Sequence, residues 1–347
     1  MIMNSQNLNH KLNGTGDLLN GKGVLKEAGW ANKLVYDYSR KMVRSSKLRL
    51  KEWDYYHVIN SEGKYAVSFT FADNGYMGLV DCSVFDFETK EKFSATETPI
   101  MPMGKLNLPS TSESGNISFQ NKNCEFHVDK NETTRHFYCN FKRTFKHTEI
   151  VADILLEQPP MDTMVIATPW KKNKKAFYYN QKITCMKAKG FVTVKGRTYT
   201  FDSSKDFGVL DWGRGVWTYN NTWFWGVGSG TVNGKPFGFN VGYGFGDTTA
   251  ASENMLFYDG KCHKLDLVDF GIPENVMDTW NMTSSDNRFR MQFTPFFNDR
   301  TDISAGVISQ HADKLFGYIN GTAVLDDGTE LKIENMPVFQ ERVHNKW

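Results

Sequence analysis

The stretch from Gly208 to Thr249 constrains the fold more than any other part of the sequence. It holds four of the chain's nine tryptophans and eleven of its 29 glycines. Near its centre stands Asn233-Gly234, the strongest short signal for a β-hairpin. A two-residue turn at this point predicts two antiparallel strands, over 223–232 and 235–245.

The same turn fixes which residues of the two strands lie opposite each other. The predicted pairs are Val232 with Lys235, Gly228 with Phe239, Gly226 with Val241, and Trp225 with Gly242. Aromatic rings would then lie across from glycines on both faces, which is a known way to stabilise glycine in a curved sheet. We expect a strongly bent hairpin, as in the wall of a small barrel. The glycine runs open no helix, so they do not predict a nucleotide site.

The rest of the chain also reads as short strands. Stretches of alternating apolar and polar residues are separated by turn signals such as Asn74-Gly75 and Asp259-Gly260. Many short strands in a chain of 347 residues indicate an all-β fold with one large domain or two. The polar run at 202–206 predicts the division. We expect a polar N-terminal arm over 1–28, an N-terminal β domain over 29–205 and a C-terminal β domain over 206–347.

The composition excludes several classes of protein. The net charge is only +2, and the basic cluster at 171–175 is typical of a solvated loop, so we predict no nucleic-acid partner. Five cysteines without close spacing argue against a disulfide framework and a zinc site, and we predict no metal. No apolar run resembles a signal peptide or spans a bilayer. We therefore expect a cytoplasmic protein without an integral membrane segment; peripheral membrane contact and oligomeric state stay open.

Carboxylates and arginines beside aromatic residues are the candidates for chemistry. A carboxyl group enclosed by rings has a raised pKa and can act as a general acid, so Asp211 and Arg214 are the predicted catalytic residues. The predicted substrate-binding residues are Trp212, Trp217, Trp223, Trp225, Tyr243, Asp247, Glu253 and Asp286. The alternative interpretation is that Asp211 pairs with Arg214 or holds a turn, and that the other carboxylates only cap turns and loops.

Several motifs resemble an uncharacterised, mainly bacterial family whose domain has no known function. They are Leu210-Asp-Trp-Gly-Arg-Gly-x-Trp217, Gly242-x-Gly-x-Gly-Asp247, Ser252-Glu-Asn254, Thr283-Ser-Ser-Asp286 and Leu325-Asp-Asp-Gly328. The match covers nearly the whole chain from Gly29. More remotely, the organisation is similar to two-domain lipocalin-like proteins that include carotenoid hydratases and tocopherol cyclases. The resemblance implies two consecutive lipocalin-like antiparallel barrels. It also implies protonation of an isoprenoid double bond at Asp211, although Arg214 after Gly213 departs from those relatives.

The leading hypothesis is a cofactor-independent enzyme that uses acid catalysis on an apolar isoprenoid or lipid-like substrate. Hydration, isomerisation and cyclisation all fit, with Asp211 as proton donor, Arg214 as its electrostatic neighbour and the tryptophans as walls that exclude water. The high content of aromatic residues and methionine suits an apolar pocket, but it also suits an ordinary β core. One alternative is therefore a non-catalytic lipid or pigment carrier, and another is a carbohydrate-binding β module with tryptophans on its surface.

Overall fold

The computed structural model describes residues 9–144 and 148–347, and its regular structure is almost entirely β-strand. Within these ranges the helical content is one 3-10 turn, η1, at Arg40–Met42. Two large antiparallel sheets follow each other along the chain, and each curls around its own hydrophobic core. The predicted all-β fold with two consecutive lipocalin-like domains is confirmed.

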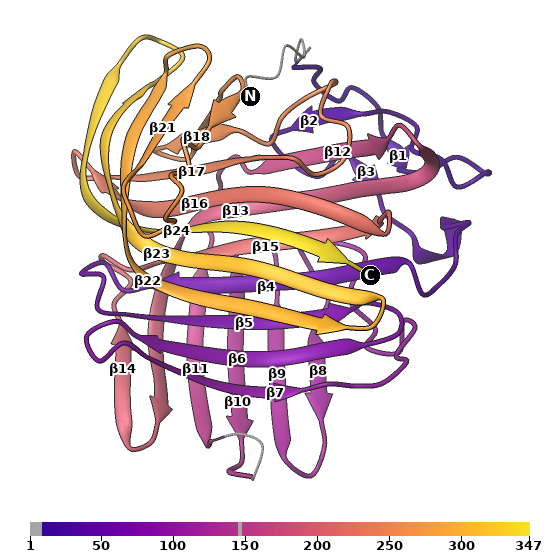
Figure 1. Cartoon of the computed structure of the whole chain (residues 1–347), viewed down its shortest axis with the longest axis horizontal. Helices are drawn as coiled ribbons and strands as arrows, with labels where there is room; N and C mark the ends of the chain where they lie inside the picture. Colours follow the sequence, from indigo (N-terminus) through magenta and orange to yellow (C-terminus); the bar gives the residue numbers. More distant parts are fainter. Residues whose placement is uncertain (1–8, 145–147) are drawn as a thin grey trace.

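The first sheet has 13 strands. They are β2 Gly29–Ala31, β4 Leu50–Ile59, β5 Tyr65–Asp73, β6 Gly78–Asp86, β7 Glu91–Glu97, β8 Ile117–Gln120, β9 Cys124–Lys130, β10 Thr134–Phe141, β11 Ile150–Glu157, β12 Met164–Trp170, β13 Asn173–Val194, β14 Arg197–Phe201 and β15 Phe207–Val216. The main path runs β7-β6-β5-β4-β15-β13-β11-β10-β9-β8. Figure 1 shows β8 to β11 crossing behind β4 to β7, so the sheet folds over into two layers. The long strand β13 joins the layers, and its pairing with β15 shifts register between Ile183 and Met186.

The second sheet has nine strands. They are β16 Asn220–Val232, β17 Lys235–Tyr243, β18 Met255–Tyr258, β19 Lys261–Lys264, β20 Val268–Asp269, β21 Trp280–Ser284, β22 Phe289–Ala305, β23 Ile308–Val324 and β24 Glu330–Lys346. Their order is β19-β18-β17-β16-β24-β23-β22-β21-β20. A separate two-stranded parallel sheet joins β1, Gly16–Asp17, to β3, Tyr36–Asp37.

The hairpin of β16 and β17 has the register predicted from its turn. All four expected pairs are present, from Val232 with Lys235 to Trp225 with Gly242. A ring covers glycine at Gly228, where an added Cβ would lie 2.7 Å from the Phe239 ring. The expected rings are absent at three other glycines, where Gln340 lies over Gly226, Met336 over Gly230 and the carboxyl group of Glu253 over Gly242. The position of Glu253 places a carboxylate in the lining of a cleft between the sheets.

The first sheet ends, and the second begins, later in the chain than the expected boundary at 205. Strand β15, Phe207–Val216, pairs with β13 and β4 and belongs to the first sheet. The second sheet begins at Asn220 with β16. The polar run at 202–206 is the turn between β14 and β15. The division into separate domains at 205 stays a prediction, and so does the independence of the arm over 1–28, whose Leu18 and Leu19 lie buried in the first core.

Alternation along the strands gives the first sheet two different faces. On β4, Tyr56 and Val58 point into the first core, whereas Tyr55 and Ile59 pack in a cluster shared with Trp225 of the second sheet. Because neighbouring side chains of a strand point to opposite faces, each of these strands contributes both to a barrel interior and to the junction of the two sheets. The candidate site lies at that junction.

Candidate active site

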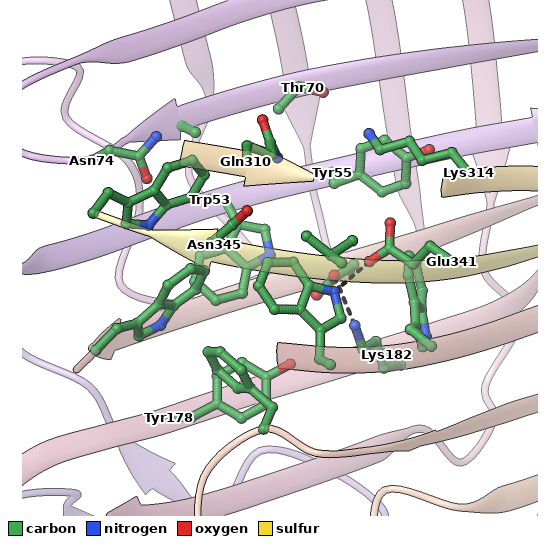
Figure 2. A pocket seen from close by; sticks show the side chains of 18 of the residues that line it. Trp53, Tyr55, Thr70, Asn74, Tyr178, Lys182, Gln310, Lys314, Glu341 and Asn345 are labelled. Atoms are coloured by element: carbon green, nitrogen blue, oxygen red, sulfur yellow. Dashed lines mark hydrogen bonds and ion pairs between the residues drawn. The ribbon is translucent and has the colours of Figure 1, made fainter. Parts of the chain in front are cut away.

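A cleft of about 190 Å³ lies between the two sheets. A single buried water needs only about 10–15 Å³, so an organic molecule fits in this space. The first sheet lines the cleft with side chains of β4, β5, β13 and β15, and the second sheet with those of β16, β23 and β24. Figure 2 shows the labelled part of this lining, from Trp53 and Tyr55 to Glu341 and Asn345.

Aromatic rings that pack on one another form the walls of the cleft. The Trp53 ring stacks on Tyr178 at 5.9 Å between centroids and meets Trp217 edge-on at 5.2 Å. Trp217 in turn contacts Trp223 at 5.9 Å and Phe245 at 4.8 Å. Such edge-to-face and stacked contacts hold the rings in fixed orientations. The walls therefore form a shaped apolar surface whose ring faces attract positive charge.

Gly213 allows one of these rings to lie against the sheet. A Cβ added to Gly213 would lie 1.9 Å from the nearest atom of the Trp53 ring. The two residues stand directly opposite each other on β15 and β4. Any side chain at position 213 would displace Trp53, so glycine here is part of the shape of the cleft.

Asp211 lies on the cleft face of β15 and pairs with a lysine from β13. Its Oδ2 atom is 2.7 Å from Nζ of Lys182, and its Oδ1 atom accepts a hydrogen bond of 2.6 Å from Asn180. The Lys182 ammonium also lies 3.9 Å from the centre of the Trp225 ring. Lys182 is absent from the residues predicted from sequence. The missing signal is the strand register, which places Lys182 directly opposite Asp211.

Two glutamates complete the polar part of the cleft. Burial raises the pKa of Glu253, and the nearby Asp211 raises it further while Lys182 opposes the shift. Atom Oε2 of Glu253 is buried without a hydrogen-bond partner in the described part of the chain. Burial likewise raises the pKa of Glu341, against the effect of the Lys314 ammonium. A carboxyl group with a raised pKa retains its proton closer to neutral pH and can deliver it to a substrate.

Glu341 is held in place by a cleft wall. Nε1–H of Trp223 donates a hydrogen bond of 2.6 Å to Oε1 of Glu341. Figure 2 shows Glu341 and Lys182 pointing into the same part of the cleft from different sheets. The sequence gives no signal for Glu341, because this residue lies more than a hundred positions from the start of the glycine-rich stretch. The pairing of β16 with β24 brings it opposite Trp225 in the cleft.

Arg214 and Trp212 lie on the opposite face of β15 from Asp211. Both are fully buried inside the first barrel. Both oxygens of Asp54 are paired. Arg214 Nη2 lies 2.9 Å from Oδ1 of Asp54, and Lys130 Nζ lies 3.1 Å from Oδ2 of Asp54. Although burial raises the pKa of Asp54, these two cations hold it below its ordinary value. The expected pairing of Arg214 with Asp211 is therefore wrong, because three residues along a strand reverse the direction of the side chain.

The other predicted residues divide between the cleft and the second sheet. Trp217, Trp223, Trp225 and Glu253 line the cleft. Tyr243 instead stacks on Phe224 at 4.6 Å beside the second core. Asp247 accepts hydrogen bonds from Thr249, and Asp286 accepts them from the backbone of Asp266 and Arg288, so both hold loops.

Over residues 9–144 and 148–347, no group of three or more His, Cys, Asp and Glu side chains is arranged to hold a metal ion. In the same ranges no helix has the length and apolar character needed to cross a bilayer. The five cysteines are free thiols, and Cys262 is the one that is not fully buried. The titratable side chains that line the cleft are carboxylates, lysines and tyrosines.

Comparison with known proteins gives a family and a shared fold. The family described as "Domain of unknown function (DUF2804)" matches residues 9–347. No curated protein matches the sequence.

Two solved structures illustrate the shared fold, and a third is similar to this chain at a lower TM-score. CghA has 9% identity and a TM-score of 0.53 over 96% of this chain and 97% of its own. A Nitrosomonas europaea protein assigned as AttH has 10% identity and a TM-score of 0.52 over 89% of this chain and 96% of its own. Kievitone hydratase from Nectria haematococca has 11% identity and a TM-score of 0.49 over 95% of this chain and 98% of its own. At such identities the likeness concerns the fold alone.

Proposed function

The chain belongs to the DUF2804 family, and we propose that it is a cofactor-independent enzyme that acts on an apolar, isoprenoid or lipid-like substrate by acid catalysis in the cleft between its two sheets. The observation that carries the proposal is Glu253, a buried carboxyl group of raised pKa in an aromatic cleft. Hydration, isomerisation and cyclisation of a carbon–carbon double bond all begin with the same protonation.

The charges of the cleft favour one retained proton. Three carboxylates, Asp211, Glu253 and Glu341, face two ammonium groups, Lys182 and Lys314. A neutral cleft needs one carboxyl group to stay protonated, and burial makes each uncompensated charge costly. Hydrogen bonds lower the pKa of both glutamates, from Trp223 for Glu341 and from Asn240 for Glu253, but Oε2 of Glu253 is buried without a partner in the described part of the chain. Glu253 is therefore the group that we assign as proton donor.

The proposed reaction uses the two glutamates in different roles. The carboxyl proton of Glu253 is transferred to one alkene carbon; the π electrons form the new C–H bond, leaving a carbocation and a carboxylate. The faces of Trp217 and Trp223 stabilise the cation. In isomerisation a carbon next to the cation then loses a proton to Glu341. In cyclisation a second double bond of the substrate first attacks the cation and closes the ring, and a carbon next to the new cation loses the proton to Glu341. In hydration, water attacks the cation, and the bound water then loses a proton to Glu341.

Asp211 takes a different role from the one expected from sequence. Both of its carboxylate oxygens accept hydrogen bonds, from Lys182 and from Asn180. These contacts hold the carboxylate against two side chains of β13. We propose that Asp211 positions Lys182 and, through its negative charge, helps to raise the pKa of Glu253.

A non-catalytic carrier of a lipid or pigment is the second candidate, because the aromatic lining alone would bind an apolar molecule. A carbohydrate-binding module receives less support. Such a module would need its tryptophans on an accessible face, whereas Trp217 and Trp225 are buried in ring clusters.

Two measurements test the proposal. Mass spectrometry of an organic extract of the purified protein should recover an apolar molecule. Incubation with a total lipid extract in D₂O should then incorporate deuterium into one component of that extract. Glu253→Gln should abolish the incorporation and keep binding, measured by quenching of tryptophan fluorescence. Asp286→Asn removes a carboxylate outside the cleft and should change neither the deuterium incorporation nor the binding. Binding without deuterium incorporation in the wild type would favour the carrier, and incorporation by Glu253→Gln would refute the assigned donor.

A further inference from the structure

Four large apolar side chains are exposed on neighbouring loops at one end of the first sheet. Ile100 is 86% exposed, Leu48 45%, Met101 42% and Met103 37%. Met101 N–H donates a hydrogen bond to the carbonyl of Tyr76, and Met103 N–H donates one to the carbonyl of Gly75. A Cβ on Gly75 would lie 3.0 Å from Cα of Leu48. The loops therefore form one surface, the apolar rim, defined by Leu48, Ile100, Met101 and Met103.

The apolar rim is continuous with the cleft. Asn74, which precedes Gly75, lines the cleft together with the C-terminal residue Trp347. Lys51 contacts both Asn74 and Trp347. Its Nζ atom donates a hydrogen bond of 2.9 Å to the carbonyl of Asn74 and lies 5.9 Å from the centre of the Trp347 ring. One end of the cleft is thus built on the same turn that supports the apolar rim.

The second sheet adds exposed apolar side chains at the same end. Figure 1 shows the C-terminus beside the turn between β22 and β23. Val307 in this turn is exposed, and its carbonyl accepts a hydrogen bond from the hydroxyl of Tyr219. The carbonyl of Tyr219 in turn accepts a hydrogen bond of 3.0 Å from the backbone N–H of Trp347. Exposed apolar groups therefore flank the cleft end on both sheets.

Positive charge accompanies this surface. The segment 40–51 contains six lysines and arginines and no acidic residue. Lys41, Arg44, Lys47 and Arg49 are exposed there. Apolar side chains that insert at the level of lipid headgroups, next to basic side chains that attract anionic lipids, are the two components of peripheral membrane binding.

We propose that the apolar rim and its basic neighbours dock the protein on an anionic lipid bilayer, with the cleft end beside the membrane surface. The docking itself is inferred from the exposed apolar and basic side chains alone. The purpose of docking rests on the proposed function, because a substrate that is insoluble in water would enter the cleft from the bilayer.

Vesicle sedimentation tests the docking surface with the full chain. The wild type should sediment with vesicles of phosphatidylcholine mixed with phosphatidylserine, and less with vesicles of phosphatidylcholine alone. Ile100→Asp should lower the partition coefficient about tenfold or more, because it replaces an inserting side chain by a charge. Lys47→Gln should lower it roughly fivefold on the anionic vesicles. Both side chains are exposed, so these variants should fold as the wild type does.

Met277→Asp is the matched control, because Met277 is also an exposed apolar residue, at 37%, but lies in the loop between β20 and β21. It should sediment as the wild type does. An equal loss in Met277→Asp, or no sedimentation of the wild type with either vesicle, would overturn the proposal. Self-association of the wild type that Ile100→Asp abolishes, without any vesicle binding, would show that this surface binds a second copy of the chain instead.

The failure of docking can be told apart from the failure of the proposed chemistry. Glu253→Gln should sediment with anionic vesicles like the wild type while losing deuterium incorporation. Ile100→Asp should lose sedimentation while keeping incorporation into lipid dispersed in detergent. Incorporation by a wild type that binds no vesicle would refute only the docking surface, and vesicle binding without any incorporation would refute only the chemistry.

Discussion

Replacement of Lys182 by methionine should destabilise the protein strongly. The Lys182 ammonium pairs with Asp211 at 2.7 Å, and their side chains are only 3% and 13% exposed. Methionine keeps an unbranched side chain of similar length, so the main loss is the charge. Removing one partner of a buried ion pair leaves the other charge uncompensated, which costs about 3–5 kcal/mol. Urea unfolding followed by circular dichroism at neutral pH measures the change.

The surface pair of Lys235 and Asp259 provides the control. Its separation is 2.6 Å, but both side chains are more than half exposed, at 51% and 53%. Lys235→Met should therefore change the unfolding midpoint little, because water screens an exposed pair. In a double-mutant cycle, Asp211→Asn should recover part of the loss caused by Lys182→Met, since it removes the charge left behind. Equal effects of Lys182→Met and Lys235→Met, or strict additivity in the cycle, would refute the reasoning from burial.

Two further predictions concern the shape of the cleft and its proton. Gly213→Ala should displace Trp53 and destabilise the fold by about 1–3 kcal/mol, measured by urea unfolding, and should weaken quenching by a cleft ligand. Gly21 has open space around it, so Gly21→Ala should change neither the free energy of unfolding nor the quenching. Wild-type stability and quenching in Gly213→Ala would contradict the steric argument. Because burial raises the pKa of Glu253 above its ordinary 4.5, the folded state binds this proton more tightly, and the free energy of unfolding should fall as pH rises from 4.5 through the raised pKa. Glu253→Gln should show a shallower fall in urea titrations across this range, and an equally steep fall would disprove the assignment.

Local chemistry explains why so much of the architecture could be predicted. Asn233 and Gly234 both have positive φ, of 51° and 75°, as a tight hairpin turn requires. That turn determines the register of β16 and β17 residue by residue. Alternation of apolar residues likewise depends only on near neighbours. The all-β class and the pairing within hairpins therefore follow from the sequence alone.

The placement of Arg214 could also have been predicted from sequence. Asp211 and Arg214 are three residues apart, which puts them on one face of a helix but on opposite faces of a strand. Once the segment is interpreted as a strand, the same alternation that groups Trp223 with Trp225 separates Asp211 from Arg214. The prediction of a catalytic pair was therefore inconsistent with the predicted fold.

The sequence by itself determined an all-β chain, a bent glycine-rich hairpin and a set of tryptophans near an aspartate. Only the tertiary structure decided that Lys182 lies opposite Asp211 and that Glu341 joins Glu253 in one cleft. The physical reason is the range of the interactions. Turns and alternation are set by residues close in the chain, whereas the cleft forms where two sheets pack and strands far apart in sequence pair.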